Sequence, residues 1–183
     1  FATTGVTLVA NASAPVVYGN SVMLGGSVPT RRANETVAVY AQRYGETSFV
    51  QVATVLTNAG GAWSYLARPR IQTAYRAGWN RGLSAVTTIG VRPTVSLRRL
   101  ASGKLTTHVG AGRSFAGRYV QLQRRRTNGK WLTLKRVRLN LRSSATFKAT
   151  LPKGRSTLRL AMSVNQAGAG YLGATSRTIL VRR

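Results

Sequence analysis

Few side chains in this sequence could carry acid–base or metal chemistry. Its 183 residues include two acidic side chains, Glu35 and Glu46, one histidine, His108, and neither aspartate nor cysteine. A Ser-His-Asp triad and thiol catalysis are therefore excluded, and a three-ligand metal site has almost no donors. We expect both glutamates to be solvated loop residues, and His108, which alternates with Leu105 and Val109, to face outward. The sequence predicts no enzyme, no catalytic residue, no metal and no cofactor.

One glycine-rich segment, Gly168–Gly173 (GAGYLG), resembles a phosphate-binding loop in composition. A dinucleotide-binding fingerprint must follow a strand and open a helix, and no helical periodicity follows Gly173. The segment is therefore predicted to be a long loop between the last two strands. Because loops at the ends of a β-sandwich often bind partners, Asn165–Gly173 is a candidate contact segment.

The basic residues are the abnormal feature of the composition. There are 28 arginines and lysines, 23 of them arginine, and the formal net charge is +26. Residues 93–183 hold 20 of these residues and no acid, whereas residues 1–92 hold 8 and both acids. The plain interpretation of the basic excess is a solvated charged face. A GC-rich genome would also raise the number of arginines, but it would not explain the complete lack of aspartate. A polyanionic partner or an extreme environment is the sharper interpretation.

The basic residues are densest in Gly117–Arg142, where 9 of 26 residues are Arg or Lys. Some of them alternate with apolar residues, as Arg136, Arg138 and Arg142 do with Val137, Leu139 and Leu141, and are predicted to face solvent. Others crowd a predicted hairpin tip, where an indole could stack on a base, a sugar ring or a guanidinium. The candidate polyanion-binding residues are Arg124, Arg125, Arg126, Lys130, Trp131, Lys135, Arg136, Arg138, Arg142, Lys148 and Arg159.

The hairpin itself is predicted from two alternating segments, Tyr119–Gln123 and Leu132–Leu134, joined across Asn128-Gly129. A three-residue loop, 127–129, with Gly129 in the left-handed conformation, would place Leu122 opposite Leu134. The alternation then changes parity. A bulge near Lys135-Arg136 is expected to return Val137 to the core opposite Val120.

Similar short alternating segments run along the whole chain and repeat once. In the first half, Val37-Ala38-Val39 precedes Tyr75-Arg76-Ala77, and in the second, Val120-Gln121-Leu122 precedes Leu158-Arg159-Leu160. The pattern restarts after Val91-Arg92-Pro93. We therefore predict an all-β chain of two tandem antiparallel immunoglobulin-like β-sandwiches, about seven strands each, over residues 1–92 and 93–183.

The first half also carries a recognisable succession of short motifs. These are Val6-Thr7-Leu8, Tyr18-Gly19-Asn20-Ser21-Val22, Val37-Ala38-Val39-Tyr40, Val52-Ala53-Thr54-Val55, Gly61-Ala62-Trp63-Ser64-Tyr65 and Val91-Arg92-Pro93. This layout resembles the bacterial immunoglobulin-like repeats of secreted surface proteins. The resemblance covers both halves, and the second half matches less closely in its turns. It implies spacers, adhesive modules and carbohydrate- or partner-binding domains, with no shared catalytic motif.

The leading expectation is a non-catalytic extracellular structural or adhesive module whose second domain contacts an anionic polymer. That polymer would be a cell-wall phosphate polymer, an acidic polysaccharide or nucleic acid. The protein would be extracellular or at the cell surface after removal of a signal peptide. No membrane insertion is expected, because no apolar run reaches the length of a span.

Two alternatives stay open. In the first, the chain is the subunit of a filament, a homopolymer in which Phe1–Val6 is donated as a strand to a neighbouring copy. In the second, it binds nucleic acid without sequence preference, although no helix-based reading motif is visible.

Overall fold

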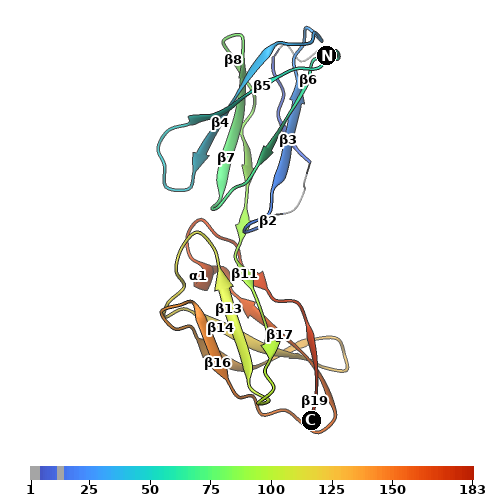
Figure 1. Cartoon of the computed structure of the whole chain (residues 1–183), viewed down its shortest axis with the longest axis vertical. Helices are drawn as coiled ribbons and strands as arrows, with labels where there is room; N and C mark the ends of the chain where they lie inside the picture. The colour runs from blue at the N-terminus through green and yellow to red at the C-terminus, as the bar shows by residue number, and fades with distance from the viewer. Residues whose placement is uncertain (1–4, 12–14) are drawn as a thin grey trace. The chain divides into compact units, whose positions relative to one another are not determined.

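The computed structural model describes residues 5–11 and 15–183, and antiparallel strands make up nearly all of its regular structure (Figure 1). The chain divides into two compact units, Phe1–Val91 (unit 1) and Arg92–Arg183 (unit 2). In each unit two antiparallel sheets enclose a hydrophobic core. The predicted fold class, all-β with tandem immunoglobulin-like sandwiches, is confirmed.

Unit 1 is built from two main sheets and one short pairing. One sheet has the order β1-β3-β6, the other β5-β4-β7-β8 with β9 also on β7, and β2 pairs with β10. The strands are β1 (Val9–Ala10), β2 (Val16–Val17), β3 (Val22–Ser27), β4 (Thr36–Arg43), β5 (Val50–Leu56), β6 (Ala62–Ala67), β7 (Thr73–Trp79), β8 (Gly82–Leu83), β9 (Thr87–Ile89) and β10 (Val91–Arg92).

Unit 2 repeats this arrangement. One sheet has the order β11-β13-β12 with β16 also on β13, and the other has the order β15-β14-β17-β18 with β19 also on β17. Its elements are β11 (Thr94–Val95), β12 (Arg98–Arg99), β13 (Leu105–Gly110), β14 (Tyr119–Arg125), β15 (Trp131–Arg138), β16 (Ser144–Phe147), β17 (Arg155–Met162), α1 (Val164–Ala167), β18 (Ala174–Thr175) and β19 (Ile179–Arg182).

The two middle strands of the larger sheet contribute the most deeply buried pairs of each core. In unit 1, Val39 of β4 pairs with Ala77 of β7, and both side chains are fully buried. In unit 2, Leu122 of β14 pairs with Leu160 of β17, and both are again fully buried. Burying a leucine side chain contributes about 1.5–3 kcal/mol, so these pairs anchor the sheets that carry the polar outer faces.

The edge strand of unit 2 contains one extra residue. Leu122 pairs with Lys135 and Gln123 pairs with Thr133, so Leu134 is a β-bulge with no partner of its own. The predicted pairing of Leu122 with Leu134 is therefore wrong, and the bulge lies one residue before the predicted position. From the tip to the Gln123–Thr133 pair the register is the predicted one, and the extra residue displaces the pairs that follow.

Beyond the bulge the predicted register is correct, because Val137 pairs with Val120 and both are buried. The predicted tip is also confirmed. Residues 127–129 form the loop, Gly129 has a φ of 77°, and its N–H donates to the Arg126 carbonyl at 3.0 Å.

Unit 1 has a bulge at the same place in its repeat. Val39 pairs with Ala53 and Tyr40 with Gln51, which leaves Val52 as the extra residue. Because the bulge occurs opposite the same core position in both units, it is a structural feature of the repeat and not a local irregularity.

The glycine-rich segment of unit 2 is a loop that is anchored to the rest of the unit. It begins with the helical turn α1, capped by Ser163, and Gln166 accepts a hydrogen bond from the Tyr119 N–H at 2.8 Å. Tyr171 is buried and packs edge-on against Phe115, with ring centroids 6.2 Å apart. Residues 168–173 contain no strand or helix, so the predicted loop is confirmed, and Tyr171 anchors it to the core.

The described part of the predicted donated strand belongs to its own unit. Val6 is buried in the core of unit 1, and the neighbouring Thr7 N–H donates to the Ser27 carbonyl at 3.0 Å. Phe1–Thr4, the rest of that segment, lie outside the described residues.

The two glutamates differ from each other. Glu35 is half-buried, and its Oε2 accepts hydrogen bonds from Thr30 Oγ1 at 2.7 Å and from the Trp79 indole N–H at 2.9 Å. Glu46 is exposed and lies 3.7 Å from Arg43. The expectation of a solvated loop residue is therefore confirmed for Glu46 and wrong for Glu35, because Glu35 is held by a partner 44 residues away.

Replacing either glutamate by alanine changes the net charge by the same amount, so a difference in stability between the two variants reports their different contacts. Glu35→Ala is expected to destabilise unit 1 by about 1–3 kcal/mol, because it leaves the half-buried indole N–H of Trp79 unpaired. Glu46→Ala should cost about 1 kcal/mol or less, as for exposed ion pairs. Hydrogen exchange of the amides of β4 and β7 measures both effects. Equal losses from the two variants would contradict the structural role of Glu35.

The turn between β5 and β6 supplies a second matched pair. Gly61 has a φ of 74°, and a Cβ placed on it would lie 2.6 Å from the Arg31 Cα. A Cβ on Gly60 would meet only Asn58 Oδ1, at 3.5 Å. We expect Gly61→Ala to destabilise unit 1 by roughly 1–3 kcal/mol or more, and Gly60→Ala to change its stability little. Thermal unfolding of the two variants tests this, and similar midpoints would be inconsistent with the close backbone approach at Gly61.

Candidate anion-binding site

The hairpin tip of unit 2 gathers cations from two strands. Arg124 and Arg125 end β14, Arg126 opens the turn, and Arg155 begins the neighbouring strand β17. Pairing of Arg124 with Leu158 brings the start of β17 alongside the end of β14. We call Arg124, Arg125, Arg126 and Arg155 the tip cluster.

The tip cluster surrounds a hollow of about 500 Å³, which Thr127 and Asn128 complete. Arg125 and Arg126 are exposed, and Arg124 is half-buried. The Nε of Arg124 is buried and has no hydrogen-bond partner among the described residues. Since residues 93–183 contain no acid, unit 2 has no carboxylate side chain to neutralise these guanidinium groups.

Like charges also face each other directly beside the tip cluster. Arg155 of β17 pairs with Arg182 of β19 in the antiparallel ladder. Like charges in directly opposed positions destabilise a β-sheet. An anion bound between the two side chains would relieve that repulsion.

Arg155 and Arg182 were not among the predicted site residues. The pairing of β17 with β14 and with β19 brings these two arginines to the tip, and both pairings join segments that are far apart in the sequence. The internal repeat indicates one of these two pairings. β4 pairs with β7 in unit 1, and the corresponding strands of unit 2 are β14 and β17.

Trp131 lies on the outer face of the sheet next to the tip, opposite Arg125. The Arg159 guanidinium carbon is 3.9 Å from the centroid of its ring, and Arg159 Nε donates to Gln123 Oε1 at 2.9 Å. Desolvation by burial lowers the pKa of the Arg159 guanidinium below its ordinary value, although arginine remains charged at neutral pH. The indole predicted to stack on a ligand therefore has one face covered by a side chain of the same sheet.

Unit 1 contains the equivalent stack. Arg76 of β7 lies over the ring of Phe49, with its guanidinium carbon 4.2 Å from the centroid, and 5.7 Å from that of Tyr40. In the repeat, Arg76 corresponds to Arg159. An arginine stacked on an aromatic residue at the start of the edge strand, or just before it, is thus a shared structural feature, so Arg159 and Trp131 stabilise the sheet as well as adding charge.

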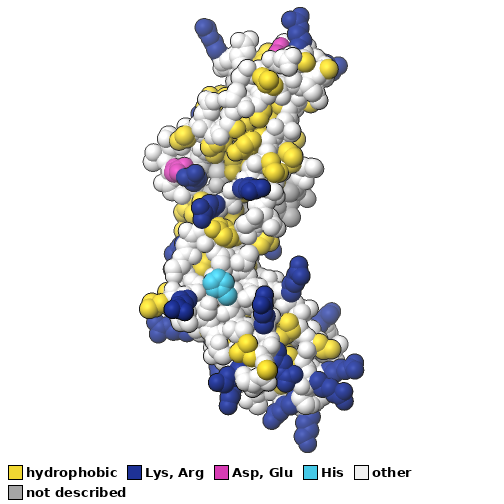
Figure 2. Space-filling model, viewed as in Figure 1, with side chains coloured by type: hydrophobic (Ala, Val, Ile, Leu, Met, Phe, Trp, Pro, Cys, Tyr) yellow, Lys and Arg dark blue, Asp and Glu magenta, His cyan; other side chains and the backbone are white. Residues whose placement is uncertain are grey.

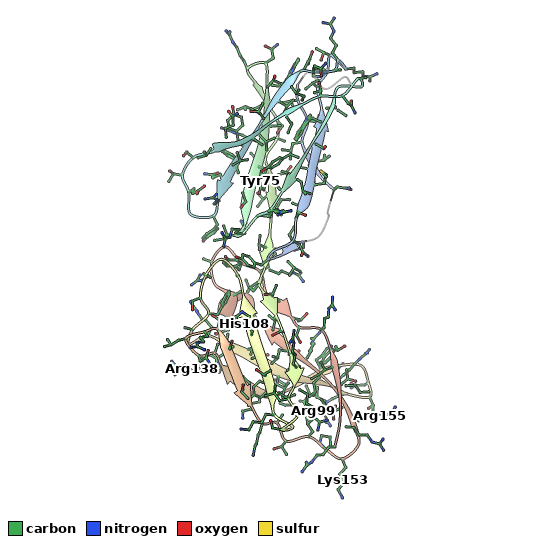
Figure 3. All side chains as sticks on the ribbon, in the orientation of Figure 1. Tyr75, Arg99, His108, Arg138, Lys153 and Arg155 are labelled. Atoms are coloured by element: carbon green, nitrogen blue, oxygen red, sulfur yellow. The ribbon has the colours of Figure 1, made fainter. Side chains whose placement is uncertain are left out.

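The remaining predicted cations lie elsewhere in unit 2. Arg136 stacks on Tyr119, 4.8 Å from the ring centroid, and Arg138 is paired with Tyr119 at the other end of β15 from the tip. At about 3.3 Å per residue, the two ends of this strand are roughly 23 Å apart. Figure 3 shows Arg138 and Arg155 on opposite sides of unit 2. The tip cluster and this second group therefore form separate surfaces.

The prediction that Arg142 lines a strand is wrong. β15 ends at Arg138, and Arg142 lies in the following turn, where its N–H donates to Asn140 Oδ1 at 2.9 Å. Leu141, expected to face inward, is 90% exposed. The Asn140 side chain closes the turn and ends the alternation.

The last predicted cations are three exposed lysines. Lys135 Nζ lies 3.4 Å from the Lys148 carbonyl oxygen, and both side chains are exposed. Lys130 is exposed at the hairpin tip, where its N–H donates to Asn128 Oδ1 at 3.1 Å. Of these three lysines, Lys130 alone adjoins the tip cluster.

The charge of unit 2 is visible on its surface. On the face drawn in Figure 2, Lys and Arg side chains crowd the end of unit 2 that carries the C-terminus, and acidic side chains appear on unit 1 alone. Arg99, Lys153 and Arg155 lie toward that end of the unit in Figure 3.

Other kinds of site are sparse in the described part of the chain. Across residues 5–11 and 15–183, no three His, Cys, Asp or Glu side chains come together where they could hold a metal ion. His108 is exposed, as predicted, and its Nδ1 lies 3.0 Å from Ser144 Oγ. Over the same residues, none of the helical structure is long and apolar enough to span a membrane.

Comparisons with known proteins identify no family. No family model matches the chain, and no curated protein matches its sequence. Among solved structures, the chain is similar to the chicken interferon gamma receptor alpha chain, with a TM-score of 0.44 and 9% sequence identity over 98% of each chain. A likeness at this level carries no functional inference, so the function has to be read from the residues of the chain.

Proposed function

We propose that this protein is a non-catalytic extracellular module that binds anionic polymers through the tip cluster of unit 2. The observation that carries the proposal is the hollow formed by four arginines in a unit without a single acidic residue. Location outside the cell is supported by the resemblance of both units to repeats of secreted bacterial surface proteins.

The chemistry of the cluster fits phosphate, sulfate or carboxylate groups. Arginine presents planar, paired N–H donors that meet two anionic oxygens at once, and it stays charged at any physiological pH. Arg125 and Arg126 are exposed, so their donors are available to a ligand. Arg124 and Arg155 complete the basic lining of the hollow.

A polymer suits the cluster better than a single small anion. Lys130 extends the cluster on the tip side, and Arg182 extends it across the sheet next to Arg155. Several cations at spaced positions engage several charges of one chain, each contact releasing a counterion. Recognition of this kind is electrostatic and carries little sequence preference.

Nucleic acid is one polyanion that such a surface would accept, together with cell-wall phosphate polymers and acidic polysaccharides. Base stacking would favour nucleic acid, but one face of the Trp131 indole is already covered by Arg159. The proposed binding therefore depends on the charge of the backbone and not on the bases.

The first test is the salt dependence of binding by the full chain. For a single-stranded oligonucleotide, log affinity should fall linearly with log salt, at a slope of about −0.7 per neutralised phosphate. Replacing Arg125, Arg126 and Arg155 together by Gln should make that slope shallower by about 2 and weaken binding by tenfold or more. Fluorescence anisotropy at several salt concentrations measures both quantities.

Two control variants carry the same change in charge. Replacing Arg31, Arg32 and Arg81 of unit 1 by Gln should alter affinity and slope little. Replacing Arg136, Arg138 and Arg142 by Gln should have an intermediate effect, because they lie away from the tip. Equal losses from all three variants, or an affinity indifferent to salt, would show that the charge is a solvated surface. A glycerol phosphate polymer and a sulfated polysaccharide, tested in parallel, rank the polymer classes.

A further inference from the structure

Unit 1 contains a second hollow, of a different chemical character. Its volume is about 330 Å³, and it opens between the two sheets, with Ala41 and Arg43 from β4, Tyr65 and Leu66 from β6, and Tyr75 from β7. Pairing of Ala41 with Tyr75 fixes the two strands of the larger sheet at this point. We call this hollow the tyrosine pocket.

Polar groups of the tyrosine pocket come from phenols and a threonine. Tyr75 is 5% exposed, and burial, followed by the nearby Tyr65, raises the pKa of its phenol to about 12. The phenol therefore stays neutral at ordinary pH and can both donate and accept a hydrogen bond. Thr73 Oγ1 donates to the Ile71 carbonyl at 2.8 Å, and the Thr73 side chain also forms a hydrogen bond with the Tyr75 phenol.

Apolar side chains complete the wall. Val52 is 41% exposed and Leu66 is 47% exposed, so neither is covered by the rest of unit 1. Such surface favours contact with the C–H face of a small ring. A bare inorganic anion would leave this surface exposed to water.

Two guanidinium groups at the pocket are available to an acid. Arg68 is exposed and forms no hydrogen bond or ion pair with the described residues. Arg43 lies 3.7 Å from Glu46 in an exposed pair, a kind of contact worth about 0–1 kcal/mol. Arg70 is already engaged, since its Nη2 donates to the Tyr18 hydroxyl at 3.0 Å.

We infer that the tyrosine pocket binds a sugar acid, a single hydroxylated six-membered ring whose carboxylate is held by Arg68 and Arg43. The volume lies at the lower end of the range of about 300–1,000 Å³ seen for ligand pockets, which limits the ligand to about one ring. The ring hydroxyls meet Tyr75, Tyr65 and Thr73. A neutral sugar leaves the arginines unused, and an aromatic acid leaves the phenols without partners.

This site is independent of the tip cluster, because it lies in the other unit and needs one carboxylate instead of a polymer. Its ligand could be a free sugar acid or the terminal residue of an acidic polysaccharide. Failure of polyanion binding at unit 2 would leave the inference intact, and the reverse also holds, since the two proposed sites share no residue.

The test is a titration of the full chain with D-glucuronate, followed by the amide and side-chain NMR signals of Ala41, Tyr65 and Tyr75. We expect these signals to shift and saturate. D-Glucose, benzoate and inorganic phosphate, each tested alone, should bind about tenfold more weakly or not at all, because each lacks one of the matched features.

Variants locate the contacts. Arg68→Gln should weaken glucuronate binding about tenfold, as expected for loss of one charge-assisted hydrogen bond, and the control Arg81→Gln should not. Tyr75→Phe should reduce the preference for glucuronate over benzoate. Arg68 and Arg81 are both exposed, so neither change disturbs the core. Equal binding of glucuronate and phosphate, equal effects of the two arginine variants, or signals that do not move would overturn the proposal.

Discussion

The bulge in the edge strand of each larger sheet decides which face the residues at the start of that strand occupy. The side-chain period of a strand is two, so one extra residue transfers every later side chain to the other face. In unit 2 the bulge at Leu134 keeps Val137 in the core and still turns Trp131 outward. The indole can then stack on Arg159 from the neighbouring strand. In unit 1 the bulge at Val52 has the same consequence for Phe49 and Arg76.

The arginines fall into two groups according to what their side chains contact. Arg76, Arg136 and Arg159 lie against aromatic rings of their own unit, where their charge is combined with packing. Arg125 and Arg126 are exposed at a turn and contact no such ring. A count of arginines would treat the two kinds alike. Part of the charge of unit 2 is therefore combined with packing against its own rings, whereas that of Arg125 and Arg126 is not.

The units also differ in how they handle acids. Both acidic residues of the chain lie in unit 1, where Glu35 accepts two hydrogen bonds and Glu46 lies 3.7 Å from Arg43. Unit 2 is the same fold without any carboxylate side chain. The fold therefore does not require the imbalance of charge. An imbalance that carries repulsion, as between Arg155 and Arg182, is consistent with selection for an anionic partner.

Local patterns predicted the fold class, the turn at Gly129 and the pairing of Val120 with Val137, because these depend on neighbouring residues and on the two-residue period. Contacts between distant segments were beyond such patterns. The Glu35–Trp79 hydrogen bond spans 44 residues. Arg155 reaches the tip only through strand pairing, and the Trp131–Arg159 stack depends on the exact position of the bulge.

The most direct test of the tip cluster as the anion-binding site is an NMR titration of the arginine Nε–H signals with a polyanion. If the account is right, the signals of Arg124, Arg125, Arg126 and Arg155 shift together with one affinity, while that of Arg76, stacked in unit 1, stays in place. Uniform shifts of all exposed arginines, with no distinction between the tip and the rest of the surface, would contradict it.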